Sequence, residues 1–327
     1  MNIKKIICSI AVILLLFSLT ACTSDISKSN SGKMKVVTVI FPEYDFARAV
    51  CGKYADVYMI TKPGAEIHGY EPSLSDINMI RSADLLVYTG GESQQWIDKI
   101  LNSFDGKKIK TLRLMDSVDL LYEEHPDYIG KEHHDHEDGS DVHDGSDKAN
   151  YSGYDEHIWL SFSNANKMLR AISDSISESD PGNSDYYKKN TDEYVEKISS
   201  ADMKMHDVLS GAKRKIIAVG DRFPFLYFVK QYGIDYCAAF SGCSPEYDAN
   251  PSTIIYITEA VKKNNIPVVF TIELSDGRMA DTICEETGAK KLVLNSCQNI
   301  SKSDFNSGLT YADIMNQNII NLKEALY

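Results

Sequence analysis

The sequence predicts an α/β protein made of two lobes of parallel-sheet β/α units, joined by a long helix, with a ligand cleft between the lobes. Short β-rich runs alternate with helical stretches in both halves of the chain, which favours parallel strands covered by helices. One long helical segment without interruption separates the two halves. Because ligands of such folds bind near the carboxyl ends of the strands, we expect the binding site between the lobes.

The N-terminal lobe is expected over residues 34–183. Ser73, with Asp76 three residues later, forms a capping-box pattern that predicts the start of a helix. The expected strands are 35–40, 56–60, 85–88 and 110–114, and the expected helices are 44–50, 74–82 and 95–104. This alternation is the pattern that parallel β/α units produce.

A single linking helix is expected over residues 184–210, because this segment contains neither Gly nor Pro until Gly211 closes it. Apolar residues recur in it at helical spacing, at Tyr187, Tyr194, Ile198 and Met205. The C-terminal lobe then follows over residues 211–327. Its expected strands are 215–219, 235–239, 268–271 and 291–294, and its expected helices are 225–232, 252–264, 278–287 and 310–326.

The beginning of the chain predicts export. Lys4 and Lys5 precede an apolar run from Ile6 to Leu19, which is the pattern of a secretory signal and is too short to cross a membrane as a helix. The end of this run, Leu-Thr-Ala-Cys, resembles a bacterial lipobox, in which Cys22 becomes the lipidated first residue. We therefore expect a signal peptide over residues 1–21 and a flexible, lipid-anchored tether over 22–33. An ordinary cleaved signal with an incidental cysteine is the alternative.

The net charge of the chain limits the classes of partner that it can attract. The formal net charge is −13, and the predicted signal removes two lysines and no acid. A chain of this negative charge repels nucleic acid and anionic lipid electrostatically, and it attracts cations.

The cysteines argue against a cysteine-based zinc cluster, because no CxxC pair is present among the seven. Cys8 leaves with the signal and Cys22 is the lipidation site. Cys243 and Cys297 both lie in loops after predicted strands of the same half, so they are the candidate disulfide of an exported chain. Unpaired thiols throughout are the alternative.

Two histidines lie in settings that suit metal capture. His68 belongs to a loop directly after a strand, flanked by Gly64 and Gly69, which permit tight turns. His157 follows Asp155 and Glu156, and a nearby carboxylate can fix the tautomer of a ligating imidazole. Each histidine taken alone is more often a surface or capping residue.

A third feature is a tract rich in histidine and acids over residues 123–147. It holds five of the eight histidines of the chain, at His125, His133, His134, His136 and His143. Such a composition predicts a disordered, solvated segment, and the density of imidazoles favours metal binding by it.

Several stretches together resemble the cluster A-I family of metal-binding proteins, the zinc or manganese component of ABC importers. The matching stretches are PGAEIHGYEPS (63–73), DINMIRSADLLVYTGGESQQWIDKIL (76–101), DEHIWLSF (155–162), FLYF (225–228), YG (232–233) and SPE (244–246). The resemblance covers nearly all of the predicted mature chain and is most specific in the first half. It implies that His68 and His157 are metal ligands. It also implies that the ligand is transported Zn(II), with Mn(II) as the alternative, and that the tract 123–147 collects zinc loosely.

The other two family ligands have no clear equivalent here. The family places His or Glu where strict spacing gives Arg222, which cannot bind a metal, and a shift by one residue gives Asp221. The last family ligand, Asp or Glu, falls near Asn295, which offers a neutral carbonyl. Glu246, Glu273 and Cys297 are weaker candidates, and Glu273 resembles a family Glu that supports the ligands from behind. Two imidazoles and one carboxylate suit zinc and leave a position open for water.

The function expected from this resemblance is a solute-binding lipoprotein on the outer face of the bacterial cell membrane. It would act as a monomer, bind no nucleic acid, have no enzymatic activity, and deliver zinc to an ABC permease and its ATPase subunit. A zinc-dependent extracellular hydrolase is one alternative, although the sequence has neither an HExxH helix nor a GxSxG elbow. A surface adhesin stabilised by a structural metal is another.

Overall fold

The computed structural model describes residues 32–65, 67, 69–104, 108–124, 153–242 and 251–327. Residues Met1–Lys33 separate from the compact region Met34–Tyr327, and all the helices and strands described below belong to this compact region. The half of the region that contains each sheet is called an α/β unit. In these described ranges, no helix is long and apolar enough to span a lipid bilayer. Cys22, His68, Cys243 and the five histidines of the tract 123–147 lie outside the described residues.

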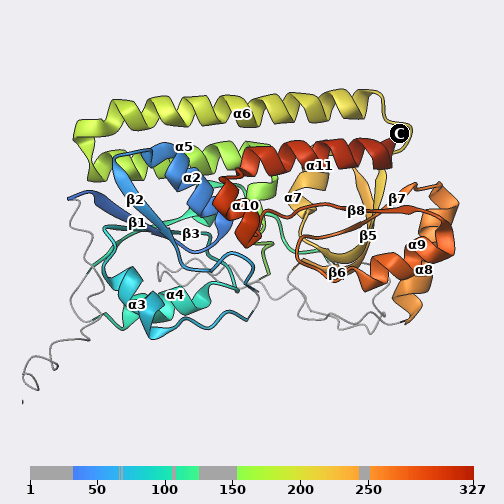
Figure 1. The fold of residues 1–327 in the computed structure, drawn as a ribbon, viewed down its shortest axis with the longest axis horizontal. Helices are drawn as coiled ribbons and strands as arrows, with labels where there is room; N and C mark the ends of the chain where they lie inside the picture. Colours follow the sequence, from blue (N-terminus) through green and yellow to red (C-terminus); the bar gives the residue numbers. More distant parts are fainter. Residues whose placement is uncertain (1–31, 66, 68, 105–107, 125–152, 243–250) are drawn as a thin grey trace, which may run out of the picture. The chain divides into compact units, whose positions relative to one another are not determined.

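The first sheet contains four parallel strands in the order β2-β1-β3-β4. Its central strands are the most buried, as expected for a parallel sheet covered on both faces. Figure 1 shows α2 on one side of this sheet and α3 and α4 on the other. These elements are β1 (Met34–Thr38), α2 (Phe41–Cys51), β2 (Ala55–Met59), α3 (Leu74–Arg81), β3 (Leu85–Tyr88), α4 (Gln95–Asn102) and β4 (Lys110–Arg113).

The second sheet repeats this topology, with four parallel strands in the order β6-β5-β7-β8. Helices α8 and α9 pack against it, and α11 also packs against β5, β7 and β8. The elements are β5 (Ile216–Phe223), α7 (Leu226–Tyr232), β6 (Asp235–Ser241), α8 (Pro251–Asn264), β7 (Val268–Thr271), α9 (Arg278–Thr287), β8 (Lys290–Val293), α10 (Lys302–Ser307) and α11 (Tyr311–Leu326). The predicted fold class, two parallel α/β units, is confirmed.

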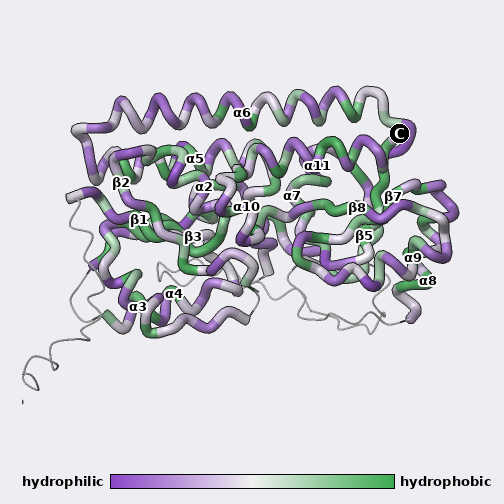
Figure 2. Tube along the Cα trace, in the orientation of Figure 1, coloured by the Kyte–Doolittle hydropathy of each residue, from purple (hydrophilic) through white to green (hydrophobic). Residues whose placement is uncertain are grey.

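Long helices connect the two sheets. Helix α5 (Phe162–Ser179) leads into α6 (Ser184–Ser210), which packs on α2 and α5 and also on α11 (Figure 1). The buried residues of α6 recur every three or four positions, so one stripe of the helix faces these neighbours while most of the remaining surface is polar (Figure 2). That stripe consists of Tyr187, Thr191, Tyr194, Ile198, Ala201, Met205 and Val208.

A few element boundaries differ from those predicted. Helix α2 begins at Phe41, because Pro42 fits the first helical turn and the carboxylate of Glu43 accepts the N–H groups of Val39 and Ile40 at 2.6 and 3.1 Å. Strand β5 continues past Val219 through an irregularity in its pairing. Helices α5 (Phe162–Ser179) and α10 have no counterpart among the predicted ranges.

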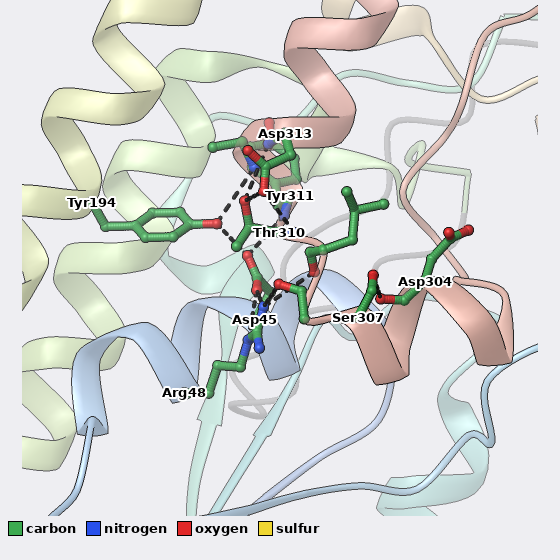
Figure 3. A network of polar contacts seen from close by, with 11 residues as sticks. Asp45, Arg48, Tyr194, Asp304, Ser307, Thr310, Tyr311 and Asp313 are labelled. Carbon is green, nitrogen blue, oxygen red and sulfur yellow. Dashed lines mark hydrogen bonds and ion pairs between the residues drawn. The ribbon is translucent and has the colours of Figure 1, made fainter.

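Three helices meet at the buried carboxylate of Asp45 on α2 (Figure 3). Its Oδ1 accepts from Nε of Arg48 at 2.8 Å, and its Oδ2 accepts from the hydroxyl of Tyr194 on α6 and from the backbone N–H of Tyr311 on α11, the latter at 2.9 Å. Arg48 also donates to the backbone oxygen of Leu309 at 3.1 Å. A pocket of about 510 Å³ opens beside this network. The network therefore ties α2 and α6 to the start of the C-terminal helix.

Candidate metal centre

His157 is buried and its ring is fixed by the acid two residues before it. Its exposed fraction is 1%, as is that of Asp155. The Oδ1 atom of Asp155 lies 3.1 Å from Nδ1 of His157 and accepts the backbone N–H of His157 at 2.8 Å. A proton on Nδ1 then points at the carboxylate, so Nε2 carries the lone pair that can bind a metal.

Nearby acids also affect the charge of this imidazole. Burial by itself lowers the pKa of His157, but the charge and hydrogen bond of Asp155, together with the charges of Glu156 and Glu123, raise that pKa above its usual value. Asp155 is held in turn by Tyr227 on α7, whose hydroxyl donates to the Asp155 backbone oxygen at 3.0 Å. The second α/β unit thus fixes the segment that carries the histidine.

Glu156 braces the other side of the same segment. Its Oε1 accepts the backbone N–H of Ser93 at 2.7 Å, and its Oε2 accepts the Ser93 hydroxyl. Gly91 leaves the room for it, because a Cβ atom at that position would lie 2.5 Å from Cγ of Glu156. Burial raises the pKa of Glu156, and the Ser93 donors oppose that rise. The loop after β3 is therefore shaped to hold Glu156.

The buried carboxylate of Glu43 also holds the loop after β3. The Oε1 atom of Glu43 accepts the backbone N–H of Thr89 at 2.7 Å and its hydroxyl at 2.8 Å. Burial raises the pKa of Glu43 to about 7, although these hydrogen bonds and those from Val39 and Ile40 lower it. Glu43 thus links the start of α2 to the loop that supports Glu156.

Gly242, the residue after β6, approaches the His157 ring at Cε1. A Cβ atom on Gly242 would lie 3.0 Å from Cε1 of His157, the carbon between the two ring nitrogens. Only glycine fits there without displacing the ring or the adjacent backbone. The second α/β unit therefore contributes a wall to the site through a residue that has no side chain.

The loop after β8 reaches the same region. The indole Nε1 of Trp159 donates to the backbone oxygen of Ser296 at 2.7 Å, and the Trp159 ring lies 5.4 Å from that of His157. In the same loop, Oδ1 of Asn299 accepts the N–H of Gly64 at 3.3 Å, and its amide donates to the Ala65 backbone oxygen. Gly242 after β6 and the loop after β8 therefore lie near His157, and the loop after β8 also contacts the segment after β2.

The predicted ligands of the second lobe are engaged with protein donors. Asp221 accepts the Thr271 hydroxyl at 2.8 Å and the backbone N–H of Arg222 at 2.9 Å. The Oδ1 of Asn295 accepts the backbone N–H of Cys297 at 2.7 Å. Within the described part of the chain, no group of three or more His, Cys, Asp or Glu side chains could hold a metal. Asp221 and Asn295 remain predictions as ligands, as does His68, which is outside the described residues.

Glu273 supports the loop after β8, which carries Asn295. Its carboxylate accepts the backbone N–H of Ser296 at 2.7 Å and also the Ser296 hydroxyl. Burial raises the pKa of Glu273, and the Ser296 donors oppose that rise. Cys297 is buried. Because Cys243 and Glu246 lie outside the described residues, the Cys243–Cys297 pairing and the Glu246 ligand stay predictions.

The sequence did not reveal several groups that shape the site. Gly91, Ser93 and Gly242 carry no pattern that marks them, because their roles depend on contacts between segments far apart in the chain. Glu43 is recognisable only as an acid in the first turn of a helix. Two α/β units whose loops converge on one buried imidazole define a two-lobed solute-binding protein.

Comparison with known proteins identifies the family. The family model of the periplasmic zinc-uptake complex component A matches residues 36–325, and the chain belongs to this family. The zinc-binding lipoprotein AdcA of Streptococcus pneumoniae (strain ATCC BAA-255 / R6) is 33% identical over 321 residues, covering 98% of this chain and 61% of AdcA. The high-affinity zinc uptake system protein ZnuA of Bacillus subtilis (strain 168) is 30% identical over 304 residues, covering 93% of this chain and 91% of ZnuA. The chain thus spans less than two thirds of AdcA.

Solved structures show the same architecture. The Zn(II)-bound ZnuA-like domain of S. pneumoniae AdcA aligns with a TM-score of 0.71 and 31% identity over 90% of this chain and 99% of that domain. The metal-dependent lipoprotein YcdH from B. subtilis aligns with a TM-score of 0.74 and 28% identity over 90% of this chain and all of that one.

Replacing Gly242 with alanine should damage the site directly. The new methyl group would press on Cε1 of His157 and on the backbone of Phe223 and Pro224, so we expect a loss of about 1–3 kcal/mol in unfolding free energy and weaker zinc binding. Urea unfolding of the metal-free protein and a zinc titration measure the two effects. Gly182→Ala is the control, because a Cβ there would meet no atom closer than 3.9 Å. Equal behaviour of the two variants would contradict the close approach of β6 to His157.

Proposed function

We propose that this chain is the extracytoplasmic receptor of an ABC importer and captures Zn(II) for delivery to its permease and ATPase subunits. The observation that carries the proposal is the buried imidazole of His157, held by Asp155 in the tautomer that directs Nε2 to a metal. Membership of the zinc-uptake family supports it. Zinc is the cargo, and no enzymatic activity is proposed.

His68 and His157 supply the imidazole ligands in this proposal, and Asp221 and Asn295 are the candidates from the second unit. Zinc accepts such nitrogen and oxygen donors at neutral pH, and manganese binds the same donor types less tightly by the usual affinity order. The five histidines of the tract 123–147 are proposed to collect zinc weakly near the site.

The location proposed for the receptor is the outer face of the cell membrane, with a lipid on Cys22 and residues 22–33 as the tether. The similar protein AdcA of S. pneumoniae is a zinc-binding lipoprotein, which supports this placement. We propose that the receptor acts as a monomer.

Thermal unfolding of the metal-stripped protein, titrated with zinc and separately with manganese, tests the proposal. A ligand that binds only the folded state raises stability by about 2.7 kcal/mol at a hundredfold excess over Kd. We expect a folded metal-free form and a larger stabilisation by zinc than by manganese. Absence of stabilisation by both metals would refute metal uptake as the function.

A further inference from the structure

The loop 294–301, which follows β8, contacts the first α/β unit at two places. The first lies beside His157, where the backbone oxygen of Ser296 accepts the indole N–H of Trp159 at 2.7 Å. The second lies on the loop after β2, to which the side chain of Asn299 forms two hydrogen bonds. Because these two segments of the first unit carry the proposed histidine ligands, one loop of the second unit spans both of them.

Asn299 uses both ends of its side-chain amide in this contact. Its Oδ1 accepts the backbone N–H of Gly64 at 3.3 Å, and its Nδ2 donates to the backbone oxygen of Ala65. Asn299 is only 6% exposed, so water does not readily replace these partners. Ala65 precedes His68 by three residues in the sequence. Asn299 therefore holds the loop after β2 shortly before the position of a proposed ligand.

The loop 294–301 is itself fixed within the second unit. Glu273 accepts the backbone N–H of Ser296 at 2.7 Å and also its hydroxyl. The Oδ1 of Asn299 accepts the backbone N–H of Ile300 at 2.7 Å, which sets the direction of the amide. The second unit therefore presents this amide from an ordered backbone, and little further ordering is needed to bind the first unit.

The loop after β2 is the more exposed partner of this contact. Lys62 and Gly64 are exposed, and Gly64 has a φ of +84°, a conformation that glycine adopts at little cost. Within the same turn, the backbone N–H of Ala65 donates to the oxygen of Lys62 at 3.0 Å. Segments with exposed backbone open at a lower free-energy cost than buried elements. Opening of this loop away from the second unit requires that both hydrogen bonds to Asn299 break.

Asn299 acts on the movement of a loop and not on the set of metal ligands. Among the described residues, each hydrogen bond of its side chain joins a backbone atom. We propose that Asn299 is a latch between the two α/β units that sets how fast zinc enters and leaves the site, an inference that rests on the proposed function. A latch slows entry and exit together, whereas the loss of a contact to the bound ligand mainly speeds exit.

The test measures zinc entry and zinc exit in Asn299→Ala, in the full chain. Stopped-flow tryptophan fluorescence gives the entry rate, since Trp159 lies beside His157, and an excess of chelator gives the exit rate. We expect both rates to rise by at least about fivefold, because two hydrogen bonds between the units are lost. The Kd for zinc, which is the ratio of the two rates, should change less than either rate.

Asn321→Ala is the matched control for this measurement. The side chain of Asn321 on α11 donates to the backbone oxygen of Val293 at 2.8 Å, so it holds the end of β8 within the second unit alone. This variant also loses an asparagine amide near the loop 294–301, but it leaves the contact with the first unit intact. Both zinc rates should equal those of the unsubstituted protein.

Asn299→Asp separates the latch from order within its own loop. An aspartate keeps an acceptor for the N–H groups of Gly64 and Ile300, but it cannot donate to the oxygen of Ala65 and repels it. We therefore expect faster entry and exit of zinc in this variant also. Fast exchange in Asn299→Ala with unchanged exchange in Asn299→Asp would overturn the latch, because disorder of the loop 294–301 would then explain the result.

Amide hydrogen exchange of the metal-free protein follows the contact without zinc. The N–H of Gly64 should exchange faster in Asn299→Ala than in Asn321→Ala, because it loses its acceptor. If the unsubstituted protein binds zinc and Asn299→Ala leaves both rates unchanged, the latch is refuted and the zinc receptor stands. If the unsubstituted protein binds no zinc, the proposed function and the role in zinc exchange both fail, even where the exchange of Gly64 confirms the contact.

Discussion

His157→Ala should reduce zinc binding more than any other single substitution among the described residues of the site. Loss of a group that only orients a ligand costs about 10–100-fold in affinity, so loss of a ligand should cost more than about 100-fold. At a zinc concentration of a hundred times the original Kd, stabilisation by zinc would then fall from about 2.7 to at most about 0.4 kcal/mol. Thermal unfolding with and without zinc measures this change.

Two further variants show whether the loss of zinc binding is specific to the His157 imidazole. His206→Ala is the matched control, because His206 on α6 is 65% exposed and pairs with Asp202. It should leave the response to zinc unchanged. Asp155→Asn should give an intermediate loss, since it disturbs the tautomer of His157 and keeps the imidazole. A full response to zinc in His157→Ala would show that this histidine does not bind the metal.

The fold was predictable because local patterns and tertiary packing agree. The stripe of α6 that includes Tyr187, Tyr194 and Met205 is the surface that packs in the structure, so periodicity alone located the helix. Parallel sheets followed from the alternation of strands and helices. The continuation of β5 to Phe223 was not predictable, because its irregular pairing depends on β6 rather than on residues near it in sequence.

The site was predictable only in part. Asp155, Glu156 and His157 are consecutive in the sequence, so the contact between Asp155 and the His157 imidazole could be predicted. The approach of Gly242 joins segments about 85 residues apart, and no local rule reveals it. Likewise, whether Asp221 faces a metal depends on the Thr271 hydroxyl, which belongs to a different strand.

Asp45→Ala should be strongly destabilising, although Asp45 belongs to no predicted site. The substitution leaves Arg48 without its carboxylate and removes the acceptor of the buried Tyr194 hydroxyl and of the Tyr311 N–H. Removing one partner of a buried ion pair costs about 3–5 kcal/mol. Because the Arg48 side chain is 31% exposed and can be hydrated, we expect about 3 kcal/mol, measured by urea unfolding of the metal-free protein.

Tyr194→Phe provides the graded comparison, because it removes one hydroxyl from the same network and should cost about 1.5–3 kcal/mol. Since both residues share one hydrogen bond, the double variant should lose less than the sum of the two single losses. The network joins α2, α6 and the start of α11, so Asp45→Ala should shift unfolding as one transition rather than loosen a single helix. A loss below about 1 kcal/mol would mean that the network contributes no more than an exposed salt bridge.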